Sequence, residues 1–345
     1  MTPELKGFLL AAALKIIAVF TVYMVGVMLV IWAERRVSAF IQDRLGPNRV
    51  GPLGLLQSVA DGVKNIMKEE TIPAEADRLL FFLAPVMSFV PALVIYAVIP
   101  FAAPLPGFDF TLPVLGRFVH QGPIPMVIAD LPIGFLFILA ISSLGVYGIV
   151  LAGWSSGSKY ALLGGIRSSA QMISYEIALG LSVVAVLVVA GNVTLSQVVA
   201  VQQQSVWFVL ALTVGFLLFI IAALAETNRL PFDLPEAEAE LITGYHTEYS
   251  SMKFSMFFIA EYANVITMSA LMSTLFFGGW DIPFTTWDEG EPSALRWLAT
   301  LLAFSAKSAF FVFTFIWIRW TLPRFRFDQL MELGWKIMLP VALAY

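Results

Sequence analysis

Three ionisable side chains lie inside long apolar runs of the sequence. Glu176 lies eight residues into its run, Glu261 seven residues into its run, and Lys307 near the middle of its run. An ion in lipid is costly unless it faces protein or water, so we interpret all three as functional. The alternatives are packing between helices for the carboxylates and, for the lysine, a side chain that extends to the interface.

A second group of charges stands where apolar runs end. Glu34, Arg35 and Arg36 end the first run, and Glu226 ends the fifth. Alternating topology puts both ends on the same side of the membrane. Charges at such positions are commonly solvated anchors, but the acidic segment that follows Glu226 favours a functional interpretation.

The connection 226–253 is strongly acidic. After Arg229 it contains five carboxylates: Asp233, Glu236, Glu238, Glu240 and Glu248. Like charges crowded beside a low-dielectric wall share protons, which is what a proton relay needs. The alternative is an acidic loop that faces water or a basic neighbour. A divalent-metal site is not favoured, because the turn-forming spacing of hard oxygen ligands is absent.

Composition excludes several classes of protein. Of 345 residues, 59% are hydrophobic and 13% charged, about half the ~25% of a soluble domain. There is no cysteine and there are two histidines, His120 and His246, so thiolate-bound iron–sulfur clusters and bis-histidine haem or zinc sites are not expected. A net charge of -4 argues against nucleic-acid binding. No glycine-rich nucleotide loop is found.

The elements that must position these charges are membrane-spanning helices. We predict an all-α polytopic membrane protein, a single domain over 1–345, with about eight spans and an amphipathic surface helix after the first. The spans are expected at about 12–33, 79–99, 131–152, 168–190, 206–226, 254–280, 297–318 and 328–345, the surface helix at about 53–67 and the acidic loop at 226–253. The last span is short, at ~27 Å if it begins near Asp328.

The distribution of basic residues predicts the orientation. Fifteen of the twenty Lys and Arg fall in one set of alternate connections and four in the other, with Lys307 inside a span. The positive-inside rule places the first set in the cytoplasm and the N-terminus outside. Most buried or interfacial carboxylates then lie in the inner half of the membrane. A polar cavity opening inward suits an amphiphile with a polar head and a lipid tail.

Several blocks of sequence are long enough to be specific, and together they cover almost the whole chain. They are Trp32–Arg36, 42–52, 54–61 with Lys64, Ser174–Glu176, 226–240, 244–250, Ala260–Asn264 and Trp317–Met331. They resemble subunit one of respiratory complex I, also designated its H subunit, the membrane component of NADH:quinone oxidoreductase where the two arms meet. That family usually has a longer eighth span, and often Ala where this chain has Pro235.

The resemblance implies residue roles. It places the quinone chamber and its access from the bilayer at Glu34, Arg35, Arg36, Arg44 and Asp61. It places proton relay and coupling at Glu176, Glu226, Arg229, Asp233, Glu236, Glu238, Glu240, Glu248, Glu261 and Lys307. No catalytic residue and no metal ligand is expected in this chain.

The function implied is coupling of quinone reduction to proton translocation, as a subunit of an H+-translocating NADH:quinone oxidoreductase. The chain itself would hold no redox centre. Quinone, either ubiquinone or menaquinone, is the substrate, and FMN and iron–sulfur clusters belong to partner subunits. The expected partners are the peripheral quinone-module subunits, small neighbouring membrane subunits and lipids, with no nucleic acid. The expected location is the bacterial inner membrane, with the mitochondrial inner membrane as alternative.

Three rival functions are weighed against this one. The membrane subunit of an energy-converting hydrogenase shares the acidic elements, but the full 57–61 surface helix and the intact acidic loop favour the quinone enzyme. A stand-alone secondary transporter would show paired broken helices, and nothing answers Pro85 and Pro91. A purely structural anchor gives no reason for ionisable residues in lipid.

Overall fold

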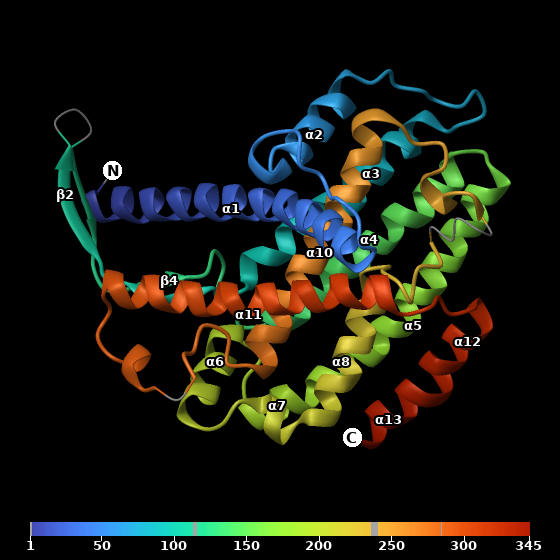
Figure 1. The fold of residues 1–345 in the computed structure, drawn as a ribbon. Helices are drawn as coiled ribbons and strands as arrows, with labels where there is room; N and C mark the ends of the chain where they lie inside the picture. Colours follow the sequence, from blue (N-terminus) through green and yellow to red (C-terminus); the bar gives the residue numbers. More distant parts are fainter. Residues whose placement is uncertain (1, 113–115, 236–240, 284) are drawn as a thin grey trace.

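The computed structural model describes all residues except Met1, 113–115, 236–240 and 284. Helices dominate it, with two small antiparallel sheets near the chain's N-terminal end (Figure 1). The α-helices are α1 (Pro3–Ile41), α2 (Gln57–Met67), α3 (Arg78–Ile95), α4 (Gly134–Ser155), α5 (Lys159–Ala190), α6 (Leu195–Gln204), α7 (Phe208–Ala211), α8 (Thr213–Glu226), α10 (Ser251–Phe276), α11 (Ala294–Thr321), α12 (Phe327–Glu332) and α13 (Leu339–Ala344). The strands are β1 (Ala102–Leu105), β2 (Phe108–Leu112), β3 (Gly116–His120) and β4 (Ile124–Met126).

Among the residues that the structure describes, six helices are long and apolar enough to cross a membrane: α1, α3 with its 3-10 extension to Val98, α4, α5, α10 and α11. The predicted fold class, an all-α polytopic membrane protein, is confirmed. The fifth expected span corresponds to α7 and α8, between which Leu212 breaks the helix. The eighth corresponds to α12, a π-helical turn over Leu333–Met338 and α13. Together these cover 327–344, which is about 27 Å of helix.

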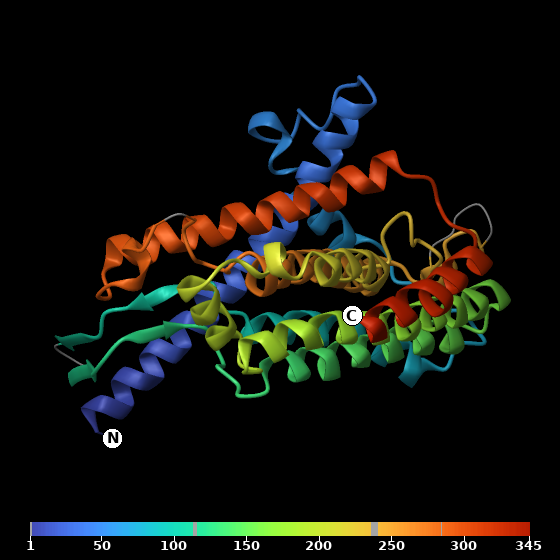
Figure 2. The same ribbon diagram turned by 90° about the horizontal axis from the view of Figure 1, so that it is seen from below.

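Helix α1 is far longer than a membrane is thick. Its 39 residues span about 58 Å, against about 30 Å of hydrocarbon. The side chain of Thr2 caps its start by accepting a hydrogen bond from the amide of Leu5. At that end Gly7 lies against the backbone of Val119 in β3, where a Cβ would collide. Figure 2 shows α1 (dark blue) running from this end across the molecule toward α2.

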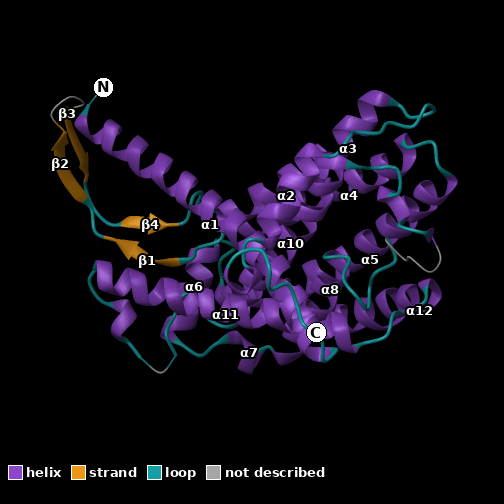
Figure 3. Cartoon of the chain, turned by 45° about the horizontal axis from the view of Figure 1, so that its top comes forward, coloured by secondary structure: helices purple, strands orange, loops and turns teal. Residues whose placement is uncertain are grey.

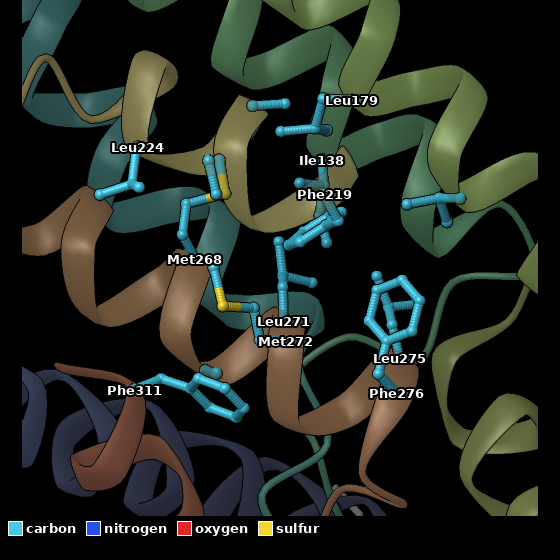
Figure 4. Packing of buried hydrophobic residues seen from close by; sticks show 14 of the residues in the cluster. Ile138, Leu179, Phe219, Leu224, Met268, Leu271, Met272, Leu275, Phe276 and Phe311 are labelled. Atoms are coloured by element: carbon cyan, nitrogen blue, oxygen red, sulfur yellow. The ribbon is translucent and has the colours of Figure 1, made fainter. Parts of the chain in front are cut away.

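The core lies where α10 packs between other helices. α10 contacts α3, α11, α1 and α8, and its second half is buried on nearly every side. Figure 4 shows Leu271 of α10 beside Phe219 of α8, with Ile138 of α4, Leu179 of α5 and Phe311 of α11 in the same cluster. Because other helices pack against α10 on several sides, its second half lies inside the protein rather than at its surface. Outer helices such as α1 leave most of their apolar side chains exposed, as lipid requires.

Two internal prolines would break α3 in water. Pro85 has no N–H, so the carbonyl of Phe81 loses its helical donor. The hydroxyl of Tyr249 donates to that carbonyl at 3.2 Å, and the Tyr249 and Phe81 rings stack 4.1 Å apart. The segment before α10 is therefore bound to the first turns of α3.

The expected surface helix is present as α2, preceded by a 3-10 turn at Pro52–Gly54. Leu53 lies inside that turn and has a left-handed backbone, φ 54°, so the chain is kinked there before α2 begins. No residue of α2 is buried, and Val59, Val63 and Ile66 are among its exposed side chains. Figure 1 shows α2 at the upper edge of the fold, and Figure 3, with the top turned forward, shows it in front of α10.

Candidate functional site

Buried charges of both signs gather where α1, the end of α8, α10 and α11 approach one another. We call Glu34, Glu226, Arg229, Glu261 and Arg319 the carboxylate cluster. Glu34 lies near the end of α1, Glu226 is the last residue of α8, Glu261 is in α10 and Arg319 is in α11. Glu34, Glu226 and Arg229 are 3–6% exposed. Ions this deeply buried must be paired or must exchange protons.

Arg229 is at the centre of the cluster. Its Nη1 lies 3.3 Å from Oε2 of Glu34, and its Nε lies 2.7 Å from Oε1 of Glu261. The guanidinium also stacks 4.1 Å from the centre of the Tyr262 ring. Burial by itself lowers the pKa of Arg229, but the charges of Glu261 and Glu34, together with Tyr262, raise it well above its usual value. Arg229 therefore stays protonated between the two carboxylates.

Arg319 extends the pairing to a second cation. Its Nη1 donates to Oε1 of Glu34 at 2.5 Å. The resulting order is Arg319, Glu34, Arg229 and Glu261, and it joins three helices through four side chains. Removing one member would leave an uncompensated buried charge, at a cost of about 3–5 kcal/mol.

A cavity adjoins the cluster. It has about 590 Å³ of empty space, its mouth included, and its lining residues include Ser88, Ser142, Met172, Glu226, Glu261 and Asn264. The Oε2 atom of Glu226 is buried without a hydrogen-bond partner among the residues that the structure describes. A buried carboxylate oxygen of this kind needs a proton or a water molecule. The cavity brings Glu226 and Glu261 together with hydroxyl and amide groups.

The segment after α8 folds back on itself. Thr227 donates from its hydroxyl to the carbonyl of Ala223 at 3.0 Å, and Asn228 adopts a left-handed backbone, φ 52°, which Asn tolerates well. Further on, Oδ2 of Asp233 accepts a hydrogen bond from Nη2 of Arg324 at 2.8 Å. This turn directs Arg229 toward α1 and α10.

Two further predicted residues pair at the surface. Nη1 of Arg35 donates to Oδ2 of Asp61 at 2.6 Å, and Gln57 donates to Oδ1 of Asp61 at 3.1 Å. The pair ties the end of α1 to the surface helix α2. Arg44 is exposed and Arg36 is half-buried.

Lys307 belongs to a different group, which we call the lysine cluster: Trp207, Asp281, Asp288 and Lys307. Its ammonium donates to the carbonyls of Phe277 (2.7 Å), Gly279 (3.1 Å) and Asp281 (2.6 Å), just beyond the C-terminus of α10. It also lies 4.4 Å from the Trp207 ring centre. A cation there is favoured by the negative end of the helix dipole.

The carboxylates of the lysine cluster are anchored by neutral donors. Trp207 Nε1 donates to Oδ2 of Asp281 at 2.6 Å, and Gln203 donates to Oδ2 of Asp288 at 2.9 Å. Burial raises the pKa of Asp281; the Trp207 hydrogen bond opposes this and the neighbouring Asp288 carboxyl adds to it.

Two residues of the connection before α10 are shielded from water. Burial lowers the pKa of His246 to about 4, so its imidazole is neutral at pH 7. Burial raises the pKa of Tyr249 to about 12, although a hydrogen bond from Ser155 opposes it. His246 therefore contributes packing against Tyr245 and Phe254 rather than charge.

The structure thus brings together only part of the residue set predicted from sequence. Glu34, Arg229 and Glu261 form one ion-paired group, and Glu226 lines the same cavity as Glu261. Glu176 interacts electrostatically with Glu226. Lys307 is apart from them: 16 residues along α10, about 24 Å, separate Glu261 from Phe277. Glu248 is half-buried, and Glu236, Glu238 and Glu240 lie outside the described residues.

Sequence reasoning missed two members of the site. Arg319 was counted only as a positive residue at a helix end, although its run ends on the same side as Glu34. Tyr262 follows Glu261 directly and was not singled out. One signal could have found Arg319. Two buried carboxylates, Glu34 and Glu261, with only Arg229 between them leave one negative charge that a second cation must balance.

No group of three or more carboxylate or histidine side chains that could hold a metal ion is found in the part of the chain that the structure describes. The fold and site define a helical membrane protein with a group of paired buried charges beside a cavity. The chain matches the family described as NADH dehydrogenase over residues 14–345 and belongs to that family. The recognition made from sequence is confirmed.

Three curated relatives are similar over nearly their whole length, and each is named as an H subunit of NADH-quinone oxidoreductase. H subunit 1 of Geobacter metallireducens is 48% identical, covering 99% of this chain and 96% of the relative. H subunit 2 of Geobacter sulfurreducens is 50% identical, covering 95% and 92%. H subunit 1 of Cytophaga hutchinsonii is 47% identical, covering 97% and 94%.

Proposed function

We propose that this chain is the membrane subunit of a proton-translocating NADH:quinone oxidoreductase that forms part of the quinone chamber and couples quinone reduction to proton movement. Membership of the NADH dehydrogenase family and the names of the relatives support the enzyme. The structural observation that carries the coupling role is the ion-pair series from Arg319 to Glu261, which ends at the cavity that Glu226 lines.

The series connects the two places where the chemistry would occur. Glu34 is adjacent in sequence to Arg35, whose partner Asp61 lies on the surface helix. At the other end, Glu261 faces the cavity. A quinone head near Arg35 and Asp61 would therefore be one residue away from a buried network of charges.

The mechanism follows from proton demand. Two electrons from an iron–sulfur cluster of a partner subunit and two protons convert a quinone to a quinol. As the reduced head draws protons, the charge near Glu34 changes, and Arg229 can shift its pairing between Glu34 and Glu261. That shift would alter the proton occupancy of Glu226 and Glu176. Asp233 and the acidic residues after it would supply protons.

This proposal assigns no cofactor to the chain itself. Quinone is its substrate, and FMN and iron–sulfur clusters are placed in partner subunits, as are the surfaces that close the chamber. The bacterial inner membrane with the N-terminus outside remains the proposed location. For Lys307 the relay role stays a prediction from the sequence. The steps proposed above do not use it, because its ammonium is already engaged by three backbone carbonyls.

The test is the double substitution Glu176→Gln and Glu226→Gln in the assembled complex. We expect quinone-linked NADH oxidation to be abolished, while NADH oxidation by an artificial acceptor continues. The matched control is Glu332→Gln, because Glu332 is 62% exposed and pairs only with Lys336 on the surface in the described structure. Unchanged quinone turnover with full proton pumping in the double variant would contradict the proposal.

The same preparation separates the rival functions. Inhibitor-sensitive NADH:quinone reduction by the purified complex supports the proposal. Hydrogen evolution without quinone reduction would instead indicate an energy-converting hydrogenase. Isolation of the chain without partners would favour a transporter.

A further inference from the structure

Gln171 is a fully buried amide in the middle of α5, and neither the proposed relay nor the quinone chamber includes it. It is 0% exposed. Its Nε2 lies 2.7 Å from the carbonyl of Phe232 and 2.8 Å from that of Ala225. Only an N–H donor can face these oxygens, so the orientation of the amide is defined by its surroundings.

The two carbonyls are the two ends of the turn that carries the central residues of the site. Ala225 immediately precedes Glu226, and Phe232 immediately precedes Asp233. A third acceptor, Oδ1 of Asn228, lies 3.2 Å from the same nitrogen. One side chain therefore closes the segment 225–232 into a loop with Glu226 and Arg229 upon it.

The anchor is also rigid with respect to the neighbouring carboxylate. Glu176 is five residues further along α5, about 7.5 Å along the helix axis. Gln171 thus fixes the turn to the same helix that carries Glu176, which interacts electrostatically with Glu226. Loss of the amide donor would leave the buried carbonyl of Phe232 without the donor that binds it, while that of Ala225 keeps the amide of Asn228, and the Phe232 end of the turn would relax away from α5.

We propose that Gln171 is a positioning residue that holds Glu226 and Arg229 in register with Glu176 by binding both ends of the segment 225–232. The inference rests on the proposed coupling function. It predicts that quinone turnover depends on an amide that touches neither quinone nor any transferred proton.

The test compares Gln171→Met and Gln171→Glu in the assembled complex, with rates divided by artificial-acceptor activity. Gln171→Met keeps the volume without a donor, and we expect quinone turnover to fall about tenfold, or ~1.4 kcal/mol, with an unchanged quinone KM. In Gln171→Glu the introduced carboxyl donates only when protonated, so its deficit shrinks as the pH falls from 8 to 6. A purely structural weakening would not produce that pH profile.

Gln202 is the matched control. It is 1% exposed, donates to the carbonyl of Thr274 and accepts from the amides of Phe208 and Gly278, far along α10 from Glu261. Gln202→Met should leave turnover per assembled complex unchanged. Equal losses in the Gln171 and Gln202 variants, or wild-type turnover in Gln171→Met, would overturn the inference. Including the double variant with Glu176→Gln and Glu226→Gln separates the two claims, because full turnover in that variant would refute the coupling function itself.

Discussion

The carboxylate cluster and the lysine cluster are two solutions to the same problem, an ion buried among membrane helices. In the lysine cluster, three backbone carbonyls satisfy the ammonium of Lys307. In the carboxylate cluster, charged side chains satisfy one another, and Glu226 retains an oxygen without a partner among the described residues. Asp288 of the lysine cluster also has a buried oxygen, Oδ1, without a hydrogen-bond partner among the described residues. The carboxylate cluster differs in that it lies against a cavity.

The difference shows which buried ions can respond to a change of charge. Backbone carbonyls at a helix end cannot gain or lose protons, so the three groups that bind the Lys307 ammonium cannot exchange a proton with it. Arg229 has two carboxylates as partners, and a change at either one alters its preference for the other. Burial alone does not distinguish structural from functional ions; the chemistry of their partners does.

The largest expected effect follows from removing the cation that the carboxylates share. Arg229→Gln leaves Glu34 and Glu261 without it, and a broken buried pair costs about 3–5 kcal/mol. We expect quinone turnover per assembled complex to fall at least about hundredfold. Arg117→Gln serves as control, because Arg117 and its partner Asp109 are about half exposed. Near-normal turnover in Arg229→Gln would contradict the claim that the carboxylate cluster, unlike the lysine cluster, takes part in coupling.

Substitution of Lys307 in the lysine cluster should reduce the stability of the complex rather than its coupling. Lys307→Met leaves three carbonyls without their donor. Each unsatisfied buried carbonyl destabilises the fold by up to about 3 kcal/mol, so we expect less assembled complex. Turnover of what does assemble should stay within about twofold of wild type, measured against artificial-acceptor activity. Lys15→Met, which frees the carbonyls of Pro125 and Val127, is the matched control. Full assembly with lost turnover would show that Lys307 is part of the relay.

The neutral histidine predicts a pH dependence of stability. The unfolded chain protonates His246 below pH 6.5, whereas the folded chain does so only near pH 4. Stability is therefore complete above pH 6.5 and declines as the pH falls through that window, by about 2 kcal/mol at pH 5. The check is the apparent melting temperature of wild type and His246→Phe at pH 7.5 and pH 5. A pH-dependent loss of equal size in both proteins would refute this assignment.

The smallest effect is expected at the surface pair. Arg35 is 46% and Asp61 29% exposed in their side chains, and exposed pairs contribute about 0–1 kcal/mol. Asp61→Asn should therefore lower the free energy of unfolding by less than about 1 kcal/mol. Any rise in the quinone KM should stay below about fivefold. Asp328→Asn, which breaks the exposed pair with Arg326, is the control. A severe loss of turnover in Asp61→Asn would place the decisive charges at the surface.

Much of this organisation could be predicted from the sequence because lipid imposes strict rules. Long apolar runs identify the helices, and ionisable residues within them mark Glu176, Glu261 and Lys307. The pairing could not be predicted, because it depends on which helix faces which. Glu34 and Arg319 are 285 residues apart in sequence, and no periodicity relates them.

The two uses of buried charge were also indistinguishable in sequence. Lys307 and Glu261 both lie inside apolar runs. What separates them is the loop after α10, which turns back so that three of its carbonyls reach the lysine. The break at Leu212 was likewise not predicted, since leucine does not force a break. The π-helical turn at Leu333–Met338 precedes Pro340, which has no N–H to donate to the carbonyl of Lys336, and this signal was missed.

The most direct measurement is infrared difference spectroscopy of the assembled complex during quinone reduction, in the region of protonated carboxyl groups. We predict a carboxyl band that changes on reduction in the wild type, disappears in Glu226→Gln and persists in both Asp281→Asn and Glu332→Gln. A band that is unaltered in Glu226→Gln but lost in Asp281→Asn would contradict the account and assign the responsive protons to the lysine cluster.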